Sequence, residues 1–434
     1  MRIGTTLPAV TVGLALLLRV LTFASAHSTK PEYPMAPDSF EYDRLARTLL
    51  ADGRFDDPTP GVQTSRTPGY PILLAGIYKL AGPFPVAVVV VQIVLSAGTV
   101  LMVHLLARQL WSPATGLIAG LLLACDAPSI SAGHRLLTET LFTFLLVAAV
   151  MAVLYRSNSE SPPSRGSLVL FGSLLALSAL TRPIGILLFG PAVLWIVWRG
   201  RSTNSPPGGT IRAIGYALLP WVGLVGGWQI RNGLATERFE VSYGPAKFLL
   251  LGRGADIVAQ RDGISAPEAR ARILQTLREA EINSRVSMKD LYASEAWALI
   301  RAHPALFLKT QWRWLPELML GTGAAGLIEA LRPAHPLVTL ALFTFCALHL
   351  LAVYAGALTS LLLAARSGPS SQTAALALLA LLIVYYVVLS TGPQTYSRFR
   401  VPMMPLLIVC AAGGFHFASI RLSRSKGILG QARM

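Results

Sequence analysis

The sequence predicts an all-α polytopic membrane protein with about ten transmembrane helices and two long outer loops that carry interfacial helices. Of its 434 residues, 53% are hydrophobic and only 13% are charged, and the hydrophobic residues gather in long runs. A soluble domain usually has about 25% charged residues, so the composition excludes an ordinary soluble enzyme. The 37 glycines and 29 prolines are scattered without a period, which excludes a collagen-like chain.

The charged residues and cysteines narrow the class further. A net charge of +16 would suggest nucleic-acid binding in a soluble chain, whereas here the placement of the charges relative to the membrane matters more. Cys125, Cys346 and Cys410 lie far apart in apolar runs. They predict neither a disulfide framework nor a zinc site, and we interpret them as small buried side chains.

Ten stretches are apolar enough to cross a bilayer, which requires about 20 residues. The short fifth and sixth stretches are separated by an Arg182-Pro183 break. The first stretch ends in an Ala-Ser-Ala sequence that resembles a signal-peptide cleavage site. Its length is sufficient for a span, and Arg19 interrupts the apolar run that a signal peptide would have. Both features favour a helix that is not cleaved from the protein. The predicted spans are residues 4–25, 84–106, 114–131, 137–155, 167–181, 183–198, 212–230, 336–364, 373–390 and 402–420.

The sidedness of the chain follows from its basic residues. With the N-terminus in the cytoplasm, the cytoplasmic connections and tails hold twelve basic residues and one acid, Glu160. The first outer loop holds five basic residues and seven acids. This is the positive-inside pattern, so both termini are predicted to be cytoplasmic, in a multi-pass protein of the inner membrane.

The predicted division of the chain follows from these spans. The second long outer loop carries Trp297, Trp312 and Trp314 among leucines and scattered charges, a composition typical of helices that lie in the membrane interface. The predicted segments are a first transmembrane helix (1–26), a first outer loop with the candidate catalytic site (27–70), transmembrane helices two to seven (71–230), a large outer loop (231–335), transmembrane helices eight to ten (336–420) and a basic cytoplasmic tail (421–434).

Arginines at the outer ends of the predicted spans break the sidedness rule. Such cations could bind a phosphate bidentately, or they could snorkel to lipid headgroups or cap helix carbonyls. Phosphate binding is the preferred interpretation for Arg398 and Arg400, which lie beside the rigid Pro402. The alternatives stay open for Arg182 and Arg231. For Arg19 and Arg135 we prefer the structural role.

Asp38 in the first outer loop has two interpretations. It precedes a helix with apolar residues at helical spacing, and Glu41 follows three positions later, so the pair could form a capping box. Alternatively, a carboxylate at the membrane surface that faces several arginines could act as a general base. Composition alone favours the cap.

Several short motifs follow one another in an order that is informative although each motif is weak alone. They extend over nearly the whole chain and are Asp38-Ser39-Phe40-Glu41-Tyr42 with Ala46 and Gly53, Arg66-Thr67-Pro68-Gly69-Tyr70-Pro71, Leu137-Thr138-Glu139-Thr140-Leu141-Phe142, Thr181-Arg182-Pro183, Pro220-Trp221, Ile230-Arg231-Asn232 and Arg398-Phe399-Arg400-Val401-Pro402-Met403-Met404-Pro405. In this order they resemble the GT-C superfamily of integral-membrane glycosyltransferases, and within it the bacterial relatives of protein O-mannosyltransferases and of the lipid A aminoarabinose transferase.

The resemblance implies an inverting enzyme that moves a sugar from a polyprenyl-phosphate donor to an acceptor at the outer face of the membrane. It implies that Asp38 is the catalytic base and that basic residues bind the donor phosphate; we assign this second role to Arg66, Arg182, Arg398 and Arg400. Further candidates for substrate contact are Glu41, Tyr42, Glu139 and Arg231.

We expect no cofactor and no metal, because the chain has no DxD pair and a lipid phosphate is already a good leaving group. The nearest clustered acids are Asp56 and Asp57. Asp126, which could be a second acidic site residue, is better interpreted as a buried helix-end residue bonded to backbone.

Two other functions compete with this prediction. A transporter or lipid flippase would place polar residues at mid-membrane depth, where this chain has almost none. A polysaccharide polymerase or ligase would use a lipid-diphosphate donor and would not need the Asp38 loop. The expected partners are a polyprenyl-phosphate sugar, the bilayer and an acceptor that is a protein, glycan or lipid, and not nucleic acid. The sequence does not identify the sugar, the acceptor or the oligomeric state.

Overall fold

The computed structural model describes residues 3–55, 66–155, 163–284, 288–368, 370–393 and 395–431. Over these residues the regular structure is helical throughout, without a strand, which confirms the predicted all-α class. Asp56 and Asp57 lie outside the described residues.

Among the described residues, seven helical stretches are long and apolar enough to cross a membrane, so the multi-pass prediction is confirmed. An eighth is possible if α5 and α6, which meet at a 59° bend, count as one span. The helices concerned are α1 (Ile3–Thr29), α4 (Pro85–Leu110), α5 (Pro113–Ala124) with α6 (Ala127–Gly133), η1 (Pro183–Leu188) with α9 (Phe189–Ser202), α10 (Pro207–Trp221) with η2 (Val222–Gly226) and α11 (Gly227–Thr236), α18 (Pro336–Ala365), α19 (Ser371–Ser390), and η4 (Ser397–Met403) with α20 (Met404–Gln431).

Two shorter apolar helices, α7 (Glu139–Leu154) and α8 (Arg165–Thr181), fall on the predicted fourth and fifth spans. With 16 and 17 residues they fall short of the roughly 20 that a straight span requires. The total of about ten spans therefore stays a prediction. The third predicted span is bent because Asp126 starts a new helix within it: its carboxylate accepts a hydrogen bond from the backbone N–H of Ser129 at 3.0 Å.

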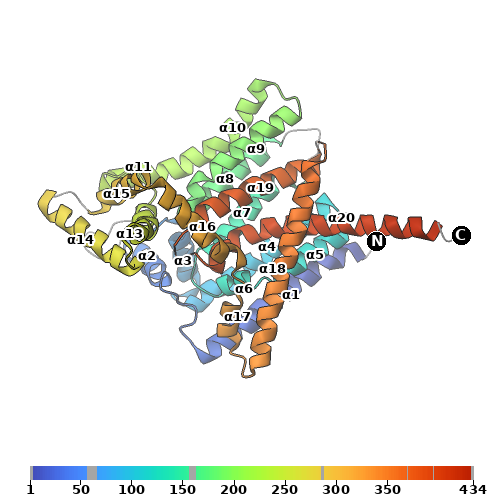
Figure 1. Ribbon diagram of the computed structural model, residues 1–434, viewed down its shortest axis with the longest axis horizontal. Helices are drawn as coiled ribbons and strands as arrows, with labels where there is room; N and C mark the ends of the chain where they lie inside the picture. The colour runs from blue at the N-terminus through green and yellow to red at the C-terminus, as the bar shows by residue number, and fades with distance from the viewer. Residues whose placement is uncertain are drawn as a thin grey trace.

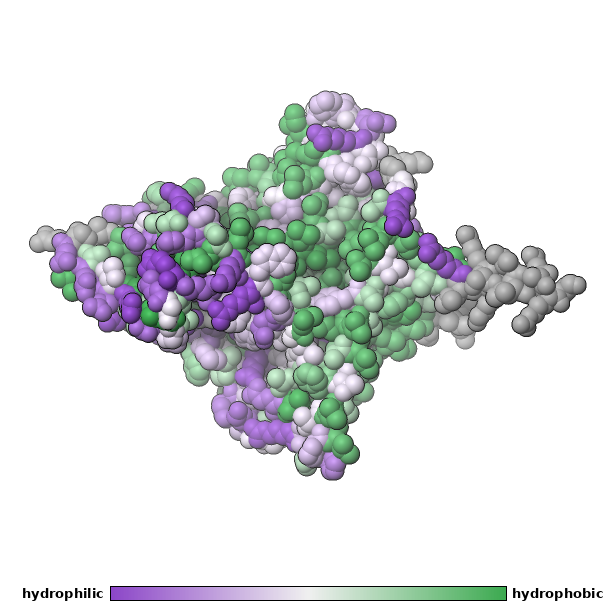
Figure 2. All heavy atoms as spheres, in the orientation of Figure 1, coloured by the Kyte–Doolittle hydropathy of each residue, from purple (hydrophilic) through white to green (hydrophobic). Residues whose placement is uncertain are grey.

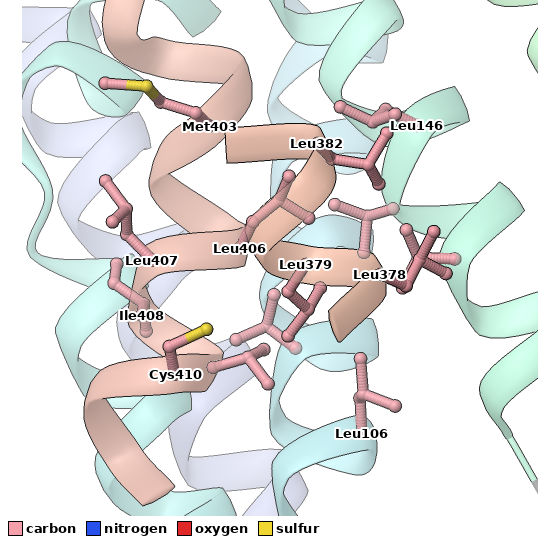
Figure 3. Packing of buried hydrophobic residues seen from close by; sticks show 14 of the residues in the cluster. Leu106, Leu146, Leu378, Leu379, Leu382, Met403, Leu406, Leu407, Ile408 and Cys410 are labelled. Atoms are coloured by element: carbon pink, nitrogen blue, oxygen red, sulfur yellow. The ribbon is translucent and has the colours of Figure 1, made fainter. Parts of the chain in front are cut away.

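The main hydrophobic core lies where α4, α7, α19 and α20 meet (Figure 3). Leu106, Leu146, Leu379 and Leu406 from these four helices are almost completely buried. α18 packs very closely on α20 because Gly414 has no side chain: a Cβ added there would lie 2.0 Å from a backbone oxygen of α18. The bundle is thus held by dense apolar packing, as expected for helices that face one another in lipid.

Several helices of the two long loops gather at one end of the molecule. In Figure 1, α2 and α13 to α15 lie at the left, whereas the N- and C-termini lie toward the right, and Figure 2 shows hydrophilic side chains concentrated over this left end. α16 lies nearer the middle of Figure 1 and α17 at the bottom. The remaining helices, which are not candidate spans, are α2 (Ser39–Asp52), α3 (Gly69–Ala81), α12 (Gly244–Phe248), η3 (Leu249–Gly254), α13 (Ala255–Asp262), α14 (Ala266–Ser284), α15 (Met288–Ala302), α16 (Pro304–Leu320) and α17 (Ala324–Leu331).

The second long loop is helical, and Trp297 on α15 and Trp312 on α16 are exposed. Exposed tryptophans on short amphipathic helices suit the headgroup depth of a bilayer. Whether these helices lie in the interface stays a prediction.

Candidate active site

Asp38 lies at the N-terminus of α2, and its partly exposed carboxylate does not cap the helix. Asp38 occupies the N-cap position, but its side chain makes no capping hydrogen bond. The turn before the helix is closed instead by Ser39, whose Oγ accepts from the N–H of Ala36 at 2.9 Å. The predicted capping box of Asp38 and Glu41 is therefore wrong, because both carboxylates bind arginines.

The packing of α2 decides which way these carboxylates face. Tyr42, Leu45 and Ala46 are buried on one side of α2, and Tyr42 meets the ring of Tyr70 on α3 edge to face, with centroids 5.1 Å apart. Burial of this apolar face fixes the rotation of the helix. The face that remains presents Asp38 and Glu41 to Arg66.

Arg66 binds the carboxylates of Asp38 and Glu41 at the start of α2. Its Nη2 donates to Asp38 Oδ1 at 3.0 Å and its Nε to Glu41 Oε2 at 2.7 Å. Its guanidinium also lies over the ring of Tyr42, 5.0 Å from the centroid, and donates to the hydroxyl at 3.4 Å. Burial by itself lowers the pKa of Arg66, but Tyr42, Glu41 and Asp38 together raise it above its ordinary value. Arg66 therefore stays charged at any physiological pH.

The backbone that carries Arg66 is anchored to the end of α8. The hydroxyl of Thr67 donates to the carbonyl of Thr181 at 2.8 Å. Two residues later, a Cβ on Gly69 would lie 2.9 Å from the carbonyl oxygen of Leu180, so only glycine allows this approach. This explains the Thr-Pro-Gly sequence after Arg66.

Arg398 joins Asp38 to a second, buried acid. From η4, its Nη1 and Nη2 both donate to Asp38 Oδ2 at 3.2 Å, and its Nε donates to Glu139 Oε1 at 2.6 Å. Its Nη1 also donates to the hydroxyl of Tyr396 at 3.3 Å. Glu139 is fully buried at the start of α7, and it forms a second ion pair, of 2.5 Å, with Arg182.

The six charged side chains form a chain in which acids and arginines are equal in number. The sequence of contacts runs Glu41, Arg66, Asp38, Arg398, Glu139, Arg182. Exposure differs among its members: the side chain of Glu139 is 0% exposed, those of the three arginines are 15–19% exposed, that of Asp38 is 35% exposed and that of Glu41 is 44% exposed. The arrangement is a polar site in which the buried carboxylate of Glu139 holds two arginines, Arg182 and Arg398, and in which the more exposed carboxylates are those of Asp38 and Glu41.

Seven of the nine residues predicted for the site are brought together here. They are Asp38, Glu41, Tyr42, Arg66, Glu139, Arg182 and Arg398.

Arg400 is elsewhere, and its predicted role in phosphate binding is corrected. Only 1% of its surface is exposed, and its guanidinium donates to the carbonyls of Leu318, Met319 and Gly321 at 2.7–3.1 Å. These carbonyls end α16, where no further helical N–H groups are available to them. Arg400 is therefore a helix cap.

Arg231 also lies apart from the charged chain. It donates to the carbonyl of Phe55 at 3.2 Å and to Asn232, and it lies over the ring of Trp228. These contacts tie the first outer loop to α11, and they support a structural role rather than the predicted substrate contact.

Arg19 and Asp126 have the predicted structural roles, whereas Arg135 forms an ion pair in place of the headgroup or helix-carbonyl contact predicted for it. Arg19 is buried and donates to the carbonyl of Ala124 at the end of α5. Arg135 pairs with Glu329 at 2.6 Å. Asp126 is 2% exposed and caps the backbone of α6. Sequence reasoning did not select Tyr396, although the polar loop before Arg398 contains it.

Within the described part of the chain, no group of three or more His, Cys, Asp or Glu side chains is arranged to hold a metal ion. The positive charge of the site comes from arginines, which bind phosphate or carboxylate groups through their N–H groups.

Comparison with known proteins supports the resemblance. Residues 65–222 match the family model of dolichyl-phosphate-mannose-protein mannosyltransferases. This stretch includes Arg66, Glu139 and Arg182. No curated protein matches the sequence.

Two solved structures of one archaeal protein share the fold at low sequence identity. Oligosaccharyltransferase AglB from Archaeoglobus fulgidus, solved with an inhibitory peptide and a dolichol-phosphate, is 14% identical with a TM-score of 0.59. Its apo form is 15% identical, also with a TM-score of 0.59. Each comparison covers 99% of this chain and 52% of the archaeal one, so this chain spans about half the length of that protein. ArnT from Cupriavidus metallidurans, bound to undecaprenyl phosphate, is 14% identical with a TM-score of 0.44, over 94% of this chain and 75% of ArnT.

The fold is shared with the oligosaccharyltransferase AglB, and part of the chain, residues 65–222, matches the family model of the dolichyl-phosphate-mannose-protein mannosyltransferases. Both findings agree with the resemblance to the GT-C superfamily that the ordered motifs predicted.

Proposed function

We propose that this protein is an inverting glycosyltransferase that moves a sugar from a polyprenyl-phosphate donor to an acceptor hydroxyl or amine. The reaction takes place at the outer face of the cytoplasmic membrane. Asp38 is the general base, and Arg66, Arg182 and Arg398 bind the donor phosphate. One observation carries the proposal: Arg66 and Arg398, from distant parts of the chain, converge on opposite oxygens of the partly exposed Asp38 carboxylate.

A lipid phosphate and Asp38 compete for the same N–H groups in this arrangement. A phosphate that binds Arg66 and Arg398 withdraws their hydrogen bonds from Asp38, and the carboxylate becomes free to accept a proton from the acceptor. Donor binding and activation of the base are thereby coupled. The buried Glu139 keeps its ion pairs with Arg398 and Arg182 and holds both arginines in place.

The bond changes form a single displacement. The acceptor oxygen or nitrogen attacks the anomeric carbon, its proton moves to Asp38, and the bond between that carbon and the phosphate oxygen breaks. The donor phosphodiester, with one negative charge, leaves as a polyprenyl phosphate that carries one more. The arginines stabilise this added charge, which develops only as the bond breaks. One displacement inverts the anomeric configuration.

The donor class follows from three considerations. The arginines suit a phosphate, the fold is shared with AglB, which has been solved with a dolichol-phosphate, and a polyprenyl tail must stay in lipid while its sugar reaches water. The loop of residues 231–335 lies over the same end of the molecule as α2, which supports a role in covering the site and contacting the acceptor.

The experiment is a transfer assay with the purified protein in detergent and a radiolabelled polyprenyl-phosphate hexose. We expect time-dependent release of label from the lipid in the presence of an acceptor, and NMR of the glycoside formed with that acceptor should show the inverted anomer. A parallel assay in liposomes follows movement of the intact lipid between leaflets. Movement of intact lipid without cleavage would replace the proposal with a flippase, and cleavage with retained configuration would exclude the single displacement.

A further inference from the structure

A cavity lies away from the charged site, between the start of α8, the end of α9 and the first half of α10. Its volume is about 320 Å³, within the range of small-molecule sites. Three arginines line it, and the lining that the structure describes includes no acidic side chain: the arginines are Arg165, Arg199 and Arg212. A cavity with this charge fits an anion.

This cavity is at the opposite end of the bundle from Asp38. α8 begins with Arg165, which lines the cavity, and ends beside Arg182 in the charged site. At about 1.5 Å per residue, its 17 residues separate the two by ~25 Å. The turn between α9 and α10 correspondingly lies at the top of Figure 1, away from α2 and α13.

The walls of the cavity are part polar and part apolar. The guanidinium of Arg165 lies over the ring of Tyr216, 5.6 Å from the centroid, and Arg199 is only 4% exposed. Leu168, Trp195 and other apolar side chains complete the lining. The N-termini of α8 and α10 add partial positive charge nearby. Such a site accepts a group with a charged head and an apolar body.

The surface around the cavity carries exposed apolar side chains of the kind that face lipid. Only 11% of the most apolar part of the α10–α11 span is buried within the protein. Ile211 on α10 and Leu170 on α8 are 69% and 51% exposed, and Trp198 on α9 is exposed as well. A lipid in a surrounding bilayer can therefore reach the cavity.

We propose that this cavity binds the phosphate headgroup of an anionic membrane phospholipid, in the leaflet opposite the charged site. Arg165, Arg199 and Arg212 bind the phosphate, and Trp195 and Leu168 contact the glycerol and the upper acyl chain. The site fixes the inner end of α8, the helix that carries Arg182 beside its outer end. The inference is independent of the proposed sugar transfer.

The test is native mass spectrometry of the full chain in detergent, titrated with phosphatidylglycerol, with phosphatidylcholine or with inorganic phosphate. We expect phosphatidylglycerol to bind about tenfold more tightly than phosphatidylcholine, since each arginine near a membrane attracts anionic lipid. The paired variant Arg165→Gln/Arg212→Gln should lose this preference, and Ala213→Leu, which fills the cavity and keeps the charges, should lose it too. The matched control is Arg201→Gln, an exposed arginine two residues from Arg199 that does not line the cavity.

Four results would overturn the proposal. Equal binding of both lipids would show that the arginines do not select a headgroup. Binding of inorganic phosphate as tightly as phosphatidylglycerol would make this a site for a free anion. An unchanged preference in Ala213→Leu, or the same loss in Arg201→Gln as in the paired variant, would place the binding outside the cavity.

Discussion

Arg398 and Glu139, which are 259 positions apart in the chain, are joined by a hydrogen bond of 2.6 Å between Nε and Oε1. Through its other two nitrogens the same guanidinium reaches Asp38. Arg398 therefore links a fully buried acid to a partly exposed one. The buried acid fixes the arginine, and the exposed acid can be displaced by a ligand.

Replacement of Arg66 should weaken donor binding and leave the fold in place. We expect Arg66→Ala to raise the KM for the lipid donor about tenfold or more, because hydrogen bonds to charged groups contribute roughly 1.5–3 kcal/mol. Steady-state kinetics with a polyprenyl-phosphate sugar measure this. The matched control is Arg278→Ala, an exposed arginine on α14. An unchanged KM in Arg66→Ala would remove Arg66 from the site.

Arg400→Ala should behave differently, because its guanidinium caps α16. Three carbonyls lose their donor, and we expect a loss of stability of roughly 1–3 kcal/mol together with an unchanged KM for the donor. Thermal unfolding in detergent and the same kinetic assay check both parts. A large rise in KM at unchanged stability would restore Arg400 to phosphate binding.

Glu139→Gln tests the buried anion. Removal of one partner from a buried ion pair typically costs roughly 3–5 kcal/mol, and Glu139 holds two arginines. We expect a clear fall in Tm. Glu329→Gln is the comparison, because Glu329 also pairs with an arginine but its side chain is 42% exposed; its loss should cost about 1 kcal/mol or less. Equal effects of the two substitutions would mean that burial of Glu139 does not matter.

Gly69→Ala should destabilise the protein by roughly 1–3 kcal/mol, since its Cβ would meet the carbonyl of Leu180 at 2.9 Å. Gly76→Ala, on the same helix with nothing within 4 Å of the added Cβ, should be neutral or slightly stabilising. Paired thermal melts compare the two. The explanation of the Thr-Pro-Gly sequence fails if the Tm of Gly69→Ala equals that of wild type.

Much of the fold could be predicted from hydrophobic runs, because burial in lipid requires them. Helices were found at every predicted span, but the bend at Asp126 was not predicted, since a run of apolar residues does not show where a side chain will cap a new helix. α3 was also missed as a helix, because its 13 residues are too few to suggest a span.

The candidate site was predicted in part. Asp38 and Arg66 lie in motifs of one loop, so the resemblance selected both. The sequence could not separate Arg398 from Arg400, two residues apart: one meets Asp38 and Glu139, and the other meets the end of α16. Such partners lie about 80 to 360 positions away, and only the packed helices bring them together.

The most direct test of the central claim is Asp38→Asn beside its matched control Asp52→Asn, an exposed acid at the end of α2. Turnover of the radiolabelled donor and binding of that donor are measured for both variants. We expect Asp38→Asn to lose about 10²–10⁴-fold in turnover, the usual contribution of a general base, and to bind the donor at least as well as wild type, because Arg66 and Arg398 no longer share their N–H groups with an anion. Asp52→Asn should resemble wild type in both. Turnover by Asp38→Asn close to that of wild type would contradict the account.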